Sequence, residues 1–104
     1  MSDIKRAKEV AESLIAAGCV EVQEFKHLTI GARVRLWSEQ WPDADRLGTG
    51  NIERIFHKPN SSWERTYGRP DVELIVRRDR PGLAPDETHA FVADYHVKLV
   101  DVTP

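Results

Sequence analysis

The spacing of the apolar residues changes at Gly18, and this change constrains the fold more than any other feature of the chain. Before Gly18 they recur every three or four residues, the period of one helix face: Ile4, Ala7, Ala11, Leu14 and Ile15. Ser2 or Asp3 can cap the start of such a helix, and Gly18 suits its left-handed end. We predict a helix over residues 3–17, whose apolar face packs on the rest of the chain or, alternatively, on a second copy in a homodimer.

After Gly18 the chain shows the two-residue alternation of strands. The alternation is weak at residues 20–22 and strict in the segment 71–77, which carries valine, leucine and valine at every second position. Within residues 51–56 the apolar Ile52 and Ile55 are three apart, which fits a strand with a bulge. Two further strand segments are residues 28–36, with a turn or bulge at Gly31, and residues 91–100, divided by a tight turn.

Turn residues separate these strands and set the domain organisation. We expect loops at residues 37–47, 57–70 and 80–86, which contain proline with aspartate, asparagine or glycine. A chain of 104 residues forms a single core. One helix followed by about five short strands predicts a mainly β fold, a small barrel or sandwich. The helix and its connector would span residues 1–25, and the β-barrel residues 26–104.

Three stretches carry a resemblance to a known fold. In residues 30–36, a glycine precedes an alternating apolar pair. Residues 48–55 have the glycine and the three-residue apolar spacing of a Gly-x-Val-x-x-Val strand. Residues 91–99 are similar to the closing segment Phe-Pro-x-Asn-Tyr-Val-x-Leu, which supplies a short 3₁₀ turn before the last strand. From Leu28 to Asp101 the chain therefore resembles the SH3-like small β-barrels, in particular KOW-type and bacterial SH3-like domains.

The departures from the SH3 pattern limit what the resemblance implies. Val92 stands where SH3 domains have proline, and His96 is an extra residue before Val97. The Ala-Leu-Tyr-Asp-Tyr opening of eukaryotic SH3 domains is absent. The resemblance thus implies a five-stranded SH3-like barrel preceded by one helix, and not membership in the family that binds proline-rich peptides. A shared fold does not fix the function.

The residues that carry chemistry are dispersed. The four histidines have no zinc-ligand spacing, and Gly48-x-Gly50 lacks the further glycine and the helix of a phosphate-binding loop. The single cysteine, Cys19, excludes an intramolecular disulfide and fits a reduced, cytoplasmic protein. Neither a targeting signal nor a membrane span is evident. We expect no enzyme activity, no cofactor and no metal site.

Aromatic residues in the two long loops indicate a binding surface. Trp41 lies in the first loop, and Trp63 and Tyr67 lie in the second. In an SH3-like barrel these loops would flank one groove, as the resemblance implies, and Arg46 and Arg65 would lie nearby. We therefore predict a protein or peptide partner bound through these five residues. The alternative is that the tryptophans cover an edge of the core.

The charge distribution leaves a second partner open. The chain has 15 basic and 17 acidic residues, a net charge of −2 that excludes a globally basic nucleic-acid binder. Residues 26–70 nevertheless hold 8 basic and 5 acidic residues, between acidic ends. Nucleic-acid or ribosome-associated binding through a local basic groove is thus an alternative. A plainer interpretation is that Arg33 and Arg35 form a solvated strand face opposite Glu53 or Glu73. A structural or accessory subunit of a larger assembly, for example of phage type, is the third hypothesis.

Overall fold

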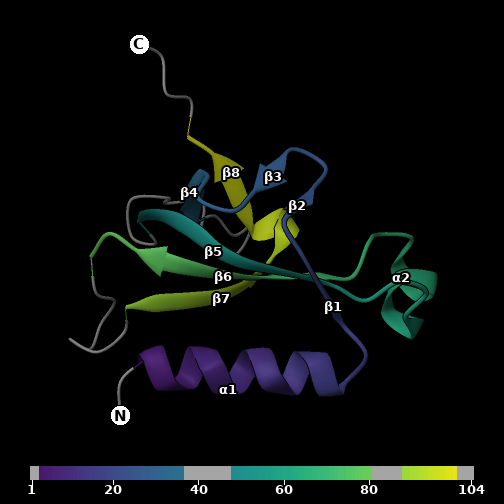
Figure 1. The fold of residues 1–104 in the computed structure, drawn as a ribbon. Helices are drawn as coiled ribbons and strands as arrows, with labels where there is room; N and C mark the ends of the chain where they lie inside the picture. Colours follow the sequence, from purple (N-terminus) through teal and green to yellow (C-terminus); the bar gives the residue numbers. More distant parts are fainter. Residues whose placement is uncertain (1–2, 37–47, 81–87, 101–104) are drawn as a thin grey trace.

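The computed structural model describes residues 3–36, 48–80 and 88–100, and it confirms a mainly β fold with an N-terminal helix (Figure 1). The elements follow in the order α1 (Asp3–Ala16), β1 (Val20–Val22), β2 (Glu24–Phe25), β3 (Leu28–Thr29), β4 (Arg33–Leu36), β5 (Thr49–His57), α2 (Ser62–Tyr67), β6 (Val72–Arg78), β7 (His89–Ala93), the 3₁₀ helix η2 (Asp94–His96) and β8 (Val97–Leu99). The expected first and third loops, residues 37–47 and 80–86, lie outside the described residues except for residue 80.

Strand β5 is the centre of the main sheet. The strands run in the order β7-β6-β5-β4-β8, and β1 adds to β5 beside its second half. All of these pairings are antiparallel, as is the separate β2–β3 hairpin. The ladders between the described residues form an open path, with β7 and β8 at its ends. Strand β1, which the sequence placed in the connector, is therefore part of the sheet.

A bulge in β5 confirms the expectation from its apolar spacing. Ile52 pairs with Val76 and Arg54 pairs with Ile75, so Glu53 is the extra residue of the longer strand. An inserted residue changes the direction in which neighbouring side chains point. The apolar Ile52 and Ile55 both reach the core, although they are three positions apart.

Two layers of apolar side chains hold the fold together. One face of the sheet buries the larger cluster, which includes Leu28, Val34, Leu36, Ile52, Ile55, Val72, Leu74, Val76 and Val97. Helix α1 lies along the other face (Figure 1). There Ala7 and Ala11 pack with Phe56 and Ile75. The helix thus packs on its own sheet, which is the first of the two alternatives that the sequence left open. The buried stripe of α1 is shorter than expected, because Ile4 and Ile15, at the two ends of the stripe, are exposed.

Two arginines of the basic middle segment form ion pairs across the sheet. The Arg33 guanidinium donates to both carboxylate oxygens of Asp79, each at 2.7 Å. Arg54 binds Glu21 in the same two-point manner, at 2.7 and 2.6 Å. The partner of Arg33 is therefore Asp79 and not Glu53 or Glu73. Exposed ion pairs of this kind add little to the stability of the fold. They also neutralise the positive charge of Arg33 and Arg54, which a nucleic-acid phosphate would otherwise bind.

Candidate binding surface

Helix α2 interrupts the segment 57–70, which the sequence analysis took for a loop. Ser61 has an extended backbone and its hydroxyl accepts a hydrogen bond from the N–H of Glu64 at 3.0 Å. This is the first half of a capping box, in which serine or threonine precedes glutamate by three residues. Gly68 ends the helix with φ 66° and donates its N–H to the Glu64 carbonyl at 2.8 Å. The local sequence thus forms a short, well-capped helix.

Helix α2 brings two of the predicted aromatic residues onto one side. Trp63 and Tyr67 are four residues apart, one helical turn, and their ring centroids are 5.1 Å apart. Tyr95 of η2 stacks nearly parallel to Trp63, with 6.3 Å between centroids and 7° between planes. The guanidinium of Arg69 lies over the ring of Tyr95, 5.4 Å from the ring centroid. We call Trp63, Tyr67, Tyr95 and Arg69 the aromatic surface.

The topology explains why these residues meet. Strand β5 ends at His57 just before α2, β6 begins at Val72 just after it, and these two residues are paired. Strand β7 runs antiparallel to β6, with Ala93 opposite Glu73, so η2 begins at the same end of the sheet. Figure 1 shows α2 beyond this end of the sheet, away from the N-terminus of α1. The aromatic surface therefore belongs to one end of the molecule.

The rings of the aromatic surface are open to solvent to different degrees. Tyr67 is 63% exposed and Tyr95 is 40% exposed, whereas Trp63 between them is half-buried. The ring of His96 also packs edge-on against Tyr95, with 4.3 Å between the ring centroids. Exposed aromatic side chains that are already stacked lose little conformational freedom when a partner covers them.

Charges of both signs surround the rings. Burial raises the pKa of Asp94, while the backbone N–H groups of Asp94 and Tyr95 and the charges of Lys26 and Arg69 act in the opposite direction. Burial also raises the pKa of Glu73, and the carboxylates of Asp71 and Asp94 raise it further. The surroundings of the aromatic surface are therefore a mixture of acidic and basic groups, and not a continuous basic patch.

The structure brings together part of the predicted site and adds residues to it. Trp63 and Tyr67 are in contact, and Arg65 is an exposed residue of the same helix. Trp41 and Arg46 lie outside the described residues. Tyr95 and Arg69 were not among the residues predicted to form the site. The Asp-Tyr of the SH3-like closing segment was the available signal for Tyr95, because the resemblance placed it in a 3₁₀ turn before the last strand.

Other kinds of site find no support in the part of the chain that the structure describes. Residues 3–36, 48–80 and 88–100 hold no group of three or more histidine, cysteine or acidic side chains that could bind a metal ion. No helix in these ranges is both long and apolar enough to cross a membrane. Burial raises the pKa of Cys19, and the charge of Asp71 adds to this effect, so its thiol is a poor nucleophile.

Stacked rings with an adjoining guanidinium can bind a partner by burying apolar area and by hydrogen bonding at the edge. They offer no nucleophile, no general base and no metal ligand. Comparison of the chain with protein-family models, curated proteins and solved structures finds no match in any of the three.

Proposed function

We propose that the chain is a non-enzymatic interaction module that binds an extended segment of a partner protein at the aromatic surface. The observation that carries this proposal is the stacking of Trp63 and Tyr95, which come from distant parts of the sequence, next to the exposed ring of Tyr67. Tryptophan, tyrosine and arginine are enriched among the few residues that dominate the binding energy at protein interfaces. All three residue types are present here within one surface.

We extend the proposal to an SH3-like arrangement of the strands. The order β7-β6-β5-β4-β8 and the 3₁₀ helix η2 before the last strand support it. In such an arrangement the segments between β4 and β5 and between β5 and β6 flank one groove, and the second of these segments contains α2. The predicted residues Trp41 and Arg46 belong to the first segment and would extend the aromatic surface.

Mixed charge favours a polypeptide over a nucleic acid as the partner. Asp94 directly precedes Tyr95 and interacts electrostatically with Glu73, and the two carboxylates would repel a phosphate backbone. Two arginines of the basic middle segment, Arg33 and Arg54, are occupied by carboxylates of this chain. A peptide carries fewer charges and can place an apolar side chain on the rings.

The test is selection of peptides from a displayed random library on the full chain, followed by affinity measurement with a labelled selected peptide. We expect the double variant Tyr67→Ala/Tyr95→Ala to bind about tenfold more weakly or worse, because two exposed anchors are truncated. The variant Ile15→Ala is the matched control, since it removes an equally accessible apolar side chain from α1. Circular dichroism of all variants verifies that the fold is retained.

Three outcomes would contradict the proposal. The first is a selected peptide that binds the double variant as tightly as the wild type. The second is binding of RNA or DNA, in place of peptides, with a steep decrease in affinity as salt is added, which would favour the nucleic-acid alternative. The third is no binding of either class, which would favour a structural or accessory subunit.

A further inference from the structure

A cavity of about 480 Å³ lies at the opposite end of the sheet from the aromatic surface. The first turns of α1 contribute Ile4 and Ala7 to its lining, β5 contributes Glu53, and β6 contributes Arg77. Arg78 and Asp79 at the end of β6, and Thr88 and His89 at the start of β7, also line it. Cavities that hold small molecules have this size and this combination of apolar walls with a few convergent polar groups.

The bulge in β5 is the reason that a carboxylate faces this cavity. Glu53 is the extra residue of the bulge and has no partner in the ladder with β6. Its Oε2 lies 3.1 Å from Nε2 of His89, which comes from β7 on the far side of β6. Side chains from two non-adjacent strands therefore meet over β6, at the floor of the cavity.

His89 is held rigidly in the wall of the cavity. Its side chain is only 5% exposed, and its second ring nitrogen, Nδ1, lies 2.9 Å from the hydroxyl of Thr88. An ionised carboxylate can only accept a hydrogen bond, so Nε2 donates to Glu53. Because the Glu53 side chain is 37% exposed, it retains acceptor positions toward the cavity. A polar group of a ligand would meet this fixed pair without any rearrangement.

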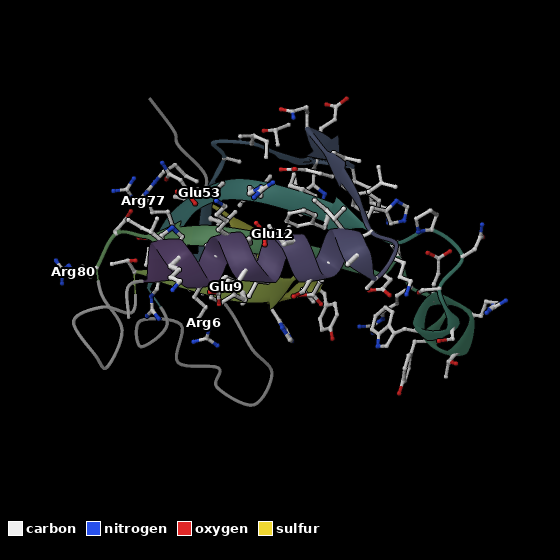
Figure 2. The ribbon with its side chains drawn as sticks, turned by 60° about the horizontal axis from the view of Figure 1, so that its bottom comes forward. Arg6, Glu9, Glu12, Glu53, Arg77 and Arg80 are labelled. Atoms are coloured by element: carbon white, nitrogen blue, oxygen red, sulfur yellow. The ribbon has the colours of Figure 1, made fainter. Side chains whose placement is uncertain are left out.

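Arg77 supplies a cationic group that the rest of the described chain does not use. The residue is exposed, pairs in the ladder with His89, and makes no hydrogen bond or ion pair with any residue in the described ranges. The nearby carboxylate of Asp79, which also lines the cavity, is taken by Arg33. Figure 2 shows Glu53 and Arg77 beside the beginning of α1, with Arg80 farther out.

We propose that this cavity binds a small organic molecule with one anionic group. Arg77 pairs with the anion, and Glu53, held by His89, accepts a hydrogen bond from a donor on the same molecule. The apolar body lies against Ile4, which is 71% exposed in the structure and would be covered by the ligand. The carboxylate of Glu53 disfavours a polyanion, because a second negative charge would lie close to it. This proposal is independent of the partner at the aromatic surface.

The test titrates the full chain with 4-hydroxybenzoate, 4-hydroxyphenyl phosphate and the neutral 4-hydroxybenzyl alcohol, each of which carries a phenol hydroxyl that can donate to Glu53, and follows backbone amide shifts by NMR. 4-Hydroxybenzoate and 4-hydroxyphenyl phosphate distinguish a carboxylate from a phosphate monoester as the anionic group. We expect millimolar or tighter binding of at least one anion, weaker binding of the alcohol, and shifts in the first turn of α1 and around Thr88. The Arg77→Gln variant should bind the anion about tenfold more weakly, because a charged hydrogen-bond donor is lost.

Arg80→Gln is the matched control, since it removes the same charge from an exposed position three residues away that does not line the cavity. We expect it to change the affinity less than about twofold. Both arginines are exposed, so neither variant threatens the fold. The proposal is overturned if none of the probes binds at millimolar concentration, if 4-hydroxybenzyl alcohol binds as tightly as the anions, or if the two variants lose affinity equally.

Discussion

Among the described glycines, Gly50 is the one at which the packing of the sheet leaves no room for a side chain. It is buried in β5, between Val34 of β4 and Arg78 of β6. A Cβ atom added here would overlap the carbonyl oxygen of Arg77 and lie 2.8 Å from Cγ1 of Val76. The backbone carbonyl is fixed by the ladder, so an alanine at this position must push β5 and β6 apart.

The cost of Gly50→Ala follows from two opposing effects. Forcing a methyl group into a packed interior costs about 1–3 kcal/mol, and the rigid backbone contact places this site at the upper end. Replacing glycine also restricts the unfolded chain, which returns about 0.4–1 kcal/mol. We therefore expect the free energy of unfolding to fall by about 2 kcal/mol, a large part of the about 5–15 kcal/mol of a typical domain.

Urea denaturation followed by tryptophan fluorescence and circular dichroism measures this change. The control is Gly31→Asn, because Gly31 has φ 85° and nothing lies within 4 Å of an added Cβ. Asparagine tolerates that backbone region, so the control should lose less than about 1 kcal/mol. A Gly50→Ala variant within about 0.5 kcal/mol of the wild type would refute the close packing of β5 on β6.

Two further predictions concern the end of the sheet that carries the aromatic surface. Ser61→Ala removes the hydroxyl that caps α2 and should lower the free energy of unfolding, measured by urea denaturation, by about 1 kcal/mol. The control Ser62→Ala, one position later, should change the free energy of unfolding little. Equal effects of the two variants would argue against the cap. Because burial raises the pKa of Glu73 in the folded state, its ionised carboxylate destabilises the fold above that pKa. Glu73→Gln should therefore be more stable than the wild type at neutral pH, and unfolding measured against pH should show this advantage disappear below the pKa that Glu73 has in the unfolded chain. An advantage that grows as the pH falls would contradict this reasoning.

Local patterns in the sequence predicted the elements that depend on local periodicity. Helix α1 was expected over residues 3–17 and spans Asp3–Ala16, and the alternating segment 71–77 corresponds to β6. The bulge in β5 was also predicted, because Ile52 and Ile55 can share a face only with an extra residue between them. In each case the spacing of the apolar residues follows from one buried face of the element. That spacing can be recognised without knowing which elements pack against the face.

Helix α2 was missed although its signal is local. Ser61 and Glu64 have the spacing of a capping box, but the surrounding proline, asparagine and glycine residues suggested a loop. The turn between β2 and β3 was also missed, because it places Lys26, and not a glycine, at a positive φ of 55°. Short elements of this kind depend on caps and turns more than on periodicity.

The two candidate sites could be predicted only in part, since tertiary pairing creates them. Trp63 contacts Tyr95 because the last residues of β5, the first of β6 and the last of β7 lie at the same end of the sheet. The spacing of residues in the sequence does not show which strand ends lie together. Glu53 meets His89 because the bulge reorients one strand and β7 lies two strands away. Each contact requires the strand order and the register together.

The pairing of β5 with three other strands has a consequence for local opening of the molecule. Its amides take part in ladders with β1, β4 and β6, so hydrogen exchange there requires disruption of most of the sheet. Helix α2 has six residues and η2 has three, and both can open without breaking any of these ladders. We therefore expect the elements that carry the aromatic surface to exchange faster than β5, and a bound segment would slow exchange in α2 and η2 while leaving that of β5 unchanged.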